Sequence, residues 1–226
     1  SVWSPETDEL IPFKYSAQRL AHKKKNKRVL QARNKLPQSP SIPLIGMISR
    51  LAYQKGMDIL AGCVEHILDS DVQLVLLGTG DPVYHKQFGQ LHRKHPNQVG
   101  VNLVFDNALA HLIEAGADMF LMPSRYEPCG LNQMYSLRYG TIPIVRATGG
   151  LADTITEYDP GTKQGTGFVF GDPESQQLLE ATLRAITLYR TNKAAWTVLR
   201  RNAMKMDFSW KRSAEEYEKL YLRMLA

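Results

Sequence analysis

Charged side chains, glycines and an aromatic ring follow the apolar runs of this 226-residue chain, each at the point where a run ends. Arg50 and Lys55 stand five residues apart after the first run, and Gly78 opens a Gly-Thr-Gly turn after the second. Phe105 ends the third run, and Glu127 follows the fourth in the stretch SRYEPCGLNQM. Cations of this kind hold phosphates, and an acid beside them suits a polyhydroxyl compound or a developing positive charge.

The two cations flank a loop, and a helical pattern begins directly after it, at Gly56. The free N–H groups at a helix N-terminus already favour an anion. Arg50 and Lys55 beside such a terminus predict a diphosphate site. This stretch alone leaves open the alternative that both are ordinary surface cations.

The turn after the second run opens like a dinucleotide fingerprint, but Val83 stands where the third glycine is required. Gly78 therefore indicates either a tight turn or a backbone that a ligand approaches closely. Phe105 suits either stacking on a nucleotide base or packing on the rim of the domain. Neither residue decides between its two interpretations without the fold.

Glu127 precedes Pro-Cys-Gly at 128–130, and a helical pattern begins at Leu131. Proline fixes the backbone and glycine removes side-chain bulk, so the free N–H groups of the helix point back towards the strand end. A carboxylate aimed at a phosphate there would repel it. We therefore expect Glu127 to point past the helix, towards a neutral polyhydroxyl compound or a developing cation. The alternative is a structural ion pair with Arg125 or Arg146.

From residue 42 onward, apolar runs alternate with helical patterns. Near-continuous apolar strands are typical of strands buried on both faces, which predicts an α/β fold: a Rossmann-like open parallel sheet of about six strands with helices on both faces. In such sheets ligands bind outside the carboxyl ends of the strands. The predicted strands are 42–49, 72–78, 100–105, 118–123, 142–147 and 167–170, and the predicted helices are 16–35, 56–70, 82–95, 108–117, 131–140, 149–158, 173–190, 193–206 and 212–225.

The two cysteines, Cys63 and Cys129, form no CxxC pair, which excludes a disulfide framework and a zinc ribbon and fits a reducing compartment. No apolar run approaches the roughly 18 residues of a membrane span, and the first residues lack the features of a signal peptide. We therefore expect a cytoplasmic protein without a membrane partner. The histidines show no metal-binding motif, so we expect no metal.

Four stretches together resemble a known family: SRLAYQKGMDIL, GTGDP, AGADMFLMPSRYEPCGLNQ and YGTIPIVRATGGLADT. They are similar to the C-terminal half of bacterial glycogen synthases and plant starch synthases, which are retaining glucosyltransferases of the two-domain GT-B architecture. The resemblance implies transfer of glucose from ADP-glucose or UDP-glucose to the non-reducing end of an α-1,4-glucan. It also implies a start near the hinge, an N-terminal GT-B domain as partner, and a plastid location if the source is a plant.

The resemblance assigns roles by position. Arg50 and Lys55 match the cations that hold the donor diphosphate and stabilise it as a leaving group, without a metal cofactor. Glu127 matches the acid that contacts the transferred glucose. Phe105 stands where the family usually has a tyrosine near the base, and Gly78 lies in the glycine-rich turn beside the donor. The remaining expected nucleotide-sugar contacts are Cys129, Gly130, Leu131, Asn132, Thr148 and Gly149.

Two alternatives stand beside a glucan synthase. The isolated chain is either a nucleotide-sugar-binding module without turnover or, less favourably, a Rossmann oxidoreductase, which Val83 and the lack of a suitably placed acid disfavour. We divide the chain into a hinge-proximal irregular segment with a basic helix over 1–40 and a Rossmann-like nucleotide-sugar-binding domain over 41–226.

The net charge of +6 is local. Residues 1–36 carry nine Lys and Arg and three Asp and Glu, whereas the other 190 residues carry 19 of each. The stretch AHKKKNKR at 21–28 is the centre of this surplus. We expect a solvated helix face there, with a phosphate- or glucan-facing patch as the alternative. Nucleic acid is disfavoured as a partner because no aromatic residues lie between the charges.

Overall fold

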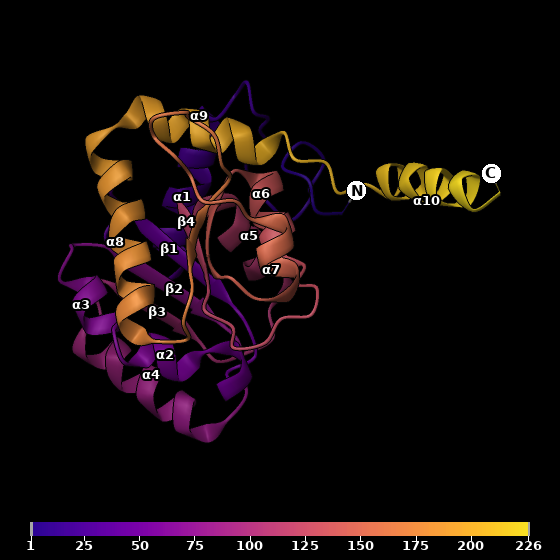
Figure 1. Cartoon of the computed structure of the whole chain (residues 1–226). Helices are drawn as coiled ribbons and strands as arrows, with labels where there is room; N and C mark the ends of the chain where they lie inside the picture. Colours follow the sequence, from indigo (N-terminus) through magenta and orange to yellow (C-terminus); the bar gives the residue numbers. More distant parts are fainter. Residues whose placement is uncertain (1, 226) are drawn as a thin grey trace.

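The computed structural model describes residues 2–225 and contains a six-stranded sheet in the order β3-β2-β1-β4-β5-β6, with every neighbouring pair parallel (Figure 1). The predicted open parallel sheet and all six predicted strands are confirmed. The order reverses between β1 and β4, which creates a switch point at their carboxyl ends. The strands are β1 (Leu44–Ile48), β2 (Gln73–Leu77), β3 (Val99–Asn102), β4 (Met119–Met122), β5 (Ile142–Arg146) and β6 (Phe168–Phe170).

Helices cover both faces of the sheet, as the buried strands require. The face covered by α2, α3, α4 and α8 lies opposite the face covered by α1, α5 and α6 (Figure 1). The helices are α1 (Ala21–Arg33), α2 (Met57–Ala61), α3 (Val64–Leu68), α4 (Pro82–Lys94), α5 (Asn107–Gly116), α6 (Asn132–Tyr139), α7 (Gly149–Thr154), α8 (Ser175–Thr191), α9 (Lys193–Met204) and α10 (Trp210–Leu225), with a short 3-10 helix, η1 (Tyr53–Lys55).

The single helix predicted over 56–70 is wrong, because the chain breaks it into α2 and α3. Ser175 at the start of α8 packs against Gly62, where a Cβ atom would lie 2.3 Å from the Ser175 Oγ. That hydroxyl donates to the carbonyl of Ile59 at 2.8 Å. The Cys63 N–H, which a continuous helix would aim at Ile59, instead bonds to Leu60 at 3.1 Å.

The basic stretch at 21–28 is a solvated helix face only in part. Lys24, Lys25 and Arg28 are exposed, but Lys23 and Lys27 are buried where α1 packs against α5. The expectation is therefore wrong for these two lysines. A buried ammonium group is tolerated only where it is paired or hydrogen-bonded, and both lysines meet this condition.

Each buried lysine has its own set of partners. Lys23 donates to the carbonyls of Glu114 and Ala115 at 2.9 and 3.1 Å, and burial lowers the pKa of its ammonium group. Lys27 pairs with Asp118 at 2.6 Å and donates to the carbonyl of Ile42 at 2.5 Å. These contacts fasten α1 to the amino-terminal edge of the sheet, because Asp118 directly precedes β4.

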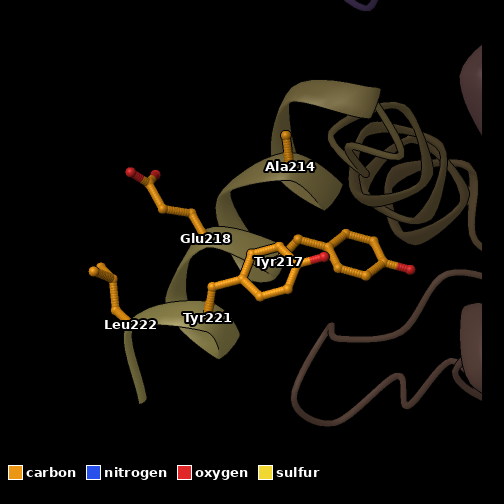
Figure 2. A pocket seen from close by; sticks show the side chains of 5 residues that line it. All are labelled: Ala214, Tyr217, Glu218, Tyr221 and Leu222. Atoms are coloured by element: carbon orange, nitrogen blue, oxygen red, sulfur yellow. The ribbon is translucent and has the colours of Figure 1, made fainter. Parts of the chain in front are cut away.

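Helix α10 leaves the body of the domain and extends away from it (Figure 1). The sequence places Ala214, Tyr217, Tyr221 and Met224 on one face, yet every described residue of α10 is exposed. A shallow hollow along this helix is lined by Ala214, Tyr217, Glu218, Tyr221 and Leu222, whose side chains are drawn in Figure 2. Within residues 2–225, no helix combines the length and the apolar character that crossing a membrane requires.

Candidate functional site

The predicted acid and one predicted cation meet at the switch point. The Lys55 Nζ lies 2.6 Å from the Glu127 Oε2, which joins the loop after β1 to the loop after β4. The expected alternative, pairing of Glu127 with Arg125 or Arg146, is wrong. Arg125 instead pairs with Asp58 at 2.6 Å, and Arg146 donates to main-chain carbonyls. Lys55 is therefore no ordinary surface cation.

Arg50 lies at the same edge and is exposed. Its guanidinium donates to the Gln54 side chain at 3.3 Å, and the Gln54 amide donates to the Tyr126 carbonyl at 3.3 Å. Gln54 also accepts from the Arg125 N–H at 2.9 Å through its own carbonyl. Gln54 thus brings the Arg50 loop to the Glu127 loop, although sequence reasoning did not single it out.

Ser124 is a second residue that sequence reasoning missed. Its hydroxyl donates to the Glu127 Oε2 at 3.0 Å, and its side chain is sealed inside the site. The signal that could have identified it is its position, directly after a buried strand and three residues before a candidate acid. Tyr53 was also missed; its ring lies under the Arg125 guanidinium at 4.3 Å.

The predicted contacts at the start of α6 lie beside Glu127. Cys129 and Leu131 are exposed, and Asn132 donates from its side chain to the Ile48 carbonyl at 2.9 Å. Gly130 has φ +70°, a left-handed conformation that favours glycine, and a Cβ there would lie 2.5 Å from Gln133 Oε1. The loop therefore positions the N-terminus of α6 at the switch point.

The glycines after β5 pack against the Glu127 loop. Gly149 has φ +45°, and its Cβ would lie 2.2 Å from the Glu127 carbonyl oxygen. The Gly150 N–H donates to the same carbonyl at 3.1 Å, and Thr148 ends the extended segment just before them. The close backbone approach at these glycines is made by the chain itself, whereas ligand contacts of Thr148 and Gly149 stay a prediction.

We expect Gly150→Ala to distort this contact, because the new Cβ would lie 1.9 Å from the Cys129 carbonyl oxygen. Overpacking of this kind costs about 1–3 kcal/mol of unfolding free energy, which urea denaturation measures. Gly89→Ala is the control: it lies within α4, meets only the end of Arg93 at 3.8 Å and should stabilise the chain slightly. Equal behaviour of the two variants would contradict the assigned contact.

Gly78 allows the turn after β2 to pack closely against the loop after β1. A Cβ on Gly78 would lie 1.8 Å from the Ser49 carbonyl oxygen, and one on Gly80 would lie 2.3 Å from that of Leu51. The Gly80 N–H donates to His85 Nε2 at 3.0 Å, so the histidine closes the turn. The glycine turn therefore supports the loop that carries Arg50.

Phe105 lies beyond the end of β3 with 92% of its surface exposed, so the expected alternative of rim packing is wrong. The carboxylate of the next residue, Asp106, has two structural contacts. It caps α5 by accepting a hydrogen bond from the Leu109 N–H at 2.9 Å, and it pairs with Arg33 at 2.6 Å. The ring of Phe105 is accordingly held on an anchored loop with its faces open to a stacking partner.

The doubly wound parallel sheet with this edge at its switch point has the fold of one half of a GT-B glycosyltransferase, as its superposition on a starch synthase catalytic domain shows. The model of the family described as "Glycosyl transferases group 1" matches residues 29–197, and the chain belongs to that family.

Individual relatives agree with this assignment and with the predicted resemblance. A glycogen synthase from Thermosipho africanus is 52% identical over 223 residues, which are 99% of this chain and 46% of that protein. One from Fervidobacterium nodosum is 52% identical over 98% of this chain and 45% of its own length. The catalytic domain of starch synthase IV from Arabidopsis thaliana, bound to ADP and acarbose, superposes with a TM-score of 0.91 at 36% identity, covering 98% of this chain and 46% of that one. The chain spans about half the length of the relatives it matches.

Proposed function

We propose that this chain is the donor-binding half of a glucan synthase that transfers glucose, with retention, from ADP-glucose or UDP-glucose to the non-reducing end of an α-1,4-glucan. The observation that carries the proposal is the Lys55–Glu127 contact of 2.6 Å beside Arg50 at the switch point. The ADP and acarbose bound to the similar starch synthase domain support it. Membership of a glycosyltransferase family argues against the oxidoreductase alternative.

The charges suit departure of a nucleoside diphosphate. As the sugar–phosphate bond breaks, negative charge grows on the diphosphate, and preorganised donors aimed at growing charge are usually the largest catalytic contribution. Arg50, Lys55 and the free N–H groups of α6 supply such donors. The Lys55 ammonium has three N–H donors, of which Glu127 takes one, so the others remain for phosphate oxygens. Glu127 accepts hydrogen bonds from the sugar and favours the positive charge that develops on it.

The remaining predicted residues would surround the donor. Phe105, with its open ring faces, stacks on the base. The backbone from Cys129 to Asn132 lines the sugar and the phosphates, together with Thr148 and Gly149. Gly78 sets the loop beside them. The exposed thiol of Cys129 suits the reducing compartment, cytoplasm or plastid, that we propose for the protein.

The partner in this proposal is the other half of the enzyme, an N-terminal GT-B domain that binds the acceptor glucan. Residues 1–40 would then be the hinge-proximal segment next to residues 41–226. The apolar side chains that α10 leaves uncovered, such as Tyr217 and Tyr221, offer a surface for that domain. Because the acceptor side of the cleft lies in the other half, the isolated chain binds nucleotide sugar without turnover.

Calorimetry of this chain with ADP, UDP and ADP-glucose tests the proposal. We expect ADP and ADP-glucose to bind, and Arg50→Ala to weaken both about tenfold, because a hydrogen bond to a charged group contributes roughly 1.5–3 kcal/mol. Arg190→Ala is the matched control, since Arg190 lies near Asp71, which precedes β2 at the opposite edge of the sheet. A chain that binds none of the three ligands would contradict the proposal. Incorporation of glucose into glycogen by this chain alone would contradict the proposed lack of turnover.

A further inference from the structure

We infer that Ser124 is a positioning residue: with Lys55 it fixes the Glu127 carboxylate so that one oxygen, Oε1, is presented to the hexose of the donor. The inference rests on the proposed function and deepens it. It assigns a role to a side chain that neither the sequence motifs nor the family resemblance singled out.

Both donors to this carboxylate contact the same oxygen. The Ser124 Oγ lies 3.0 Å from the Glu127 Oε2, and the Lys55 Nζ lies 2.6 Å from it. Oε1 accepts no hydrogen bond from any residue between 2 and 225, yet it is not among the side-chain atoms that are sealed from solvent without a partner. The carboxylate is therefore held by one oxygen and open at the other.

Ser124 itself is too deeply buried to meet a ligand. Only 2% of its surface is exposed, against 7% for Glu127, which reaches the edge of the site. Any effect of the Ser124 hydroxyl on a bound sugar must consequently pass through Glu127. This separates Ser124 from Arg50, whose side chain is exposed.

The serine is fixed from a neighbouring strand. Arg146, at the end of β5, donates through Nε to the Ser124 carbonyl at 2.8 Å and through Nη2 to the Arg125 carbonyl at 2.5 Å. These two bonds anchor the backbone on which the hydroxyl sits. A glutamate has several rotatable bonds, and fixing its geometry before the ligand arrives removes an ordering cost from binding.

The two hydrogen bonds to Oε2, from Lys55 and from Ser124, differ in how they respond when the nucleotide sugar binds. Lys55 is also a phosphate ligand in the proposed function, so its ammonium is shared between the carboxylate and the diphosphate. The Ser124 hydroxyl makes a charge-assisted bond that a phosphate does not compete for. Without the Ser124 hydrogen bond, the Glu127 carboxylate can move together with the Lys55 ammonium, and Oε1 is no longer held towards the sugar. Recognition of the sugar should suffer, whereas recognition of the nucleotide should not.

The test is calorimetry of this chain with ADP and with ADP-glucose. We expect Ser124→Ala to weaken ADP-glucose about tenfold, the loss that corresponds to one charge-assisted hydrogen bond, and to change ADP by less than about twofold. Glu127→Ala should shift the ratio of the two dissociation constants in the same direction. Ser124→Ala added to Glu127→Ala should have no further effect, because two residues that act through one interaction are not additive.

Ser136→Ala is the matched control. Its hydroxyl donates to the Glu114 Oε2 at 2.8 Å, so the variant also removes a buried serine–glutamate bond, but in the contact between α5 and α6. Ser136→Ala should therefore lower stability but leave the ratio of the ADP and ADP-glucose dissociation constants unchanged. If Ser124→Ala fails to fold, Ser124→Cys, which keeps a weak donor of similar size, should give an intermediate shift of the ratio.

The possible failures are distinguishable. A wild-type chain that binds neither ligand overturns the proposed function, and this inference with it. A chain that binds both, with Glu127→Ala shifting the ratio and Ser124→Ala or Ser124→Cys leaving it unchanged, overturns only the role of Ser124. The role of Ser124 is also overturned if Glu127→Ala does not shift the ratio, or if Ser136→Ala shifts it as much as Ser124→Ala does.

Discussion

Replacing Glu127 with alanine in the two-domain enzyme proposed to contain this chain is expected to lower kcat for glucosyl transfer by roughly 10²–10³, the usual effect of removing one preorganised group that stabilises transition-state charge. The structure supplies the reason. Glu127 is the one predicted site acid, and it lies against Lys55 at 2.6 Å at the switch point. In the proposed function, its loss removes the negative group that faces the developing positive charge on the sugar.

Radiolabelled glucose transferred from ADP-glucose to glycogen measures this effect. Glu65→Ala is a suitable control, because Glu65 also pairs with a lysine, Lys94, at 2.9 Å, but on α3 and with its side chain 44% exposed. That variant should transfer at close to the wild-type rate. If Glu127→Ala kept wild-type kcat while binding the donor normally, Glu127 would have no part in the chemistry.

The second large effect concerns stability. Lys27→Ala should reduce the free energy of unfolding by about 3–5 kcal/mol, because it leaves a largely buried carboxylate without its cation. Asp118 would keep the hydrogen bond from the Leu44 N–H at 3.0 Å but lose the Lys27 contact of 2.6 Å. The carbonyl of Ile42 would lose its Lys27 donor as well, whereas that of Pro40 would keep the hydrogen bond from the Tyr189 hydroxyl at 3.2 Å. Urea denaturation followed by circular dichroism measures the change.

The same helix provides the comparison. Arg33 on α1 pairs with Asp106 at the same 2.6 Å, but its side chain is 42% exposed and that of Asp106 is 29% exposed. Exposed ion pairs contribute about 0–1 kcal/mol, so Arg33→Ala should cost far less than Lys27→Ala. The double variant Lys27→Met, Asp118→Asn should recover part of the loss, since it removes both charges together. Equal costs for Lys27→Ala and Arg33→Ala would show that burial of the Lys27 pair contributes nothing.

These predictions give different roles to residues that look alike in the sequence. The stretch 21–28 reads as a uniform basic surface, yet Lys27 fastens α1 to the sheet and Lys24 is solvated. Lys55 reads as one of two phosphate ligands, yet in the structure it is also the direct partner of Glu127. Only the environment of each ammonium group separates the three.

The sequence by itself determined the architecture and placed the candidate site residues at one edge of the sheet. Run length and periodicity are local properties, so the apolar runs identified all six strands, and parallel strands brought their carboxyl ends to one edge whatever their order. The motifs after those strands then indicated the family. Each of these inferences needs only residues that are close together in the chain.

The tertiary structure alone decided which charges meet. Lys55 and Glu127 are 72 residues apart, and Lys27 and Asp118 are 91 apart, so no local pattern could pair them. It also decided that Ser175 interrupts the helix predicted over 56–70 and that α10 stays uncovered. The physical reason is common to all of these: burial and pairing depend on which distant segments pack together, and the free energy of a charge is set by that surrounding rather than by its neighbours in sequence.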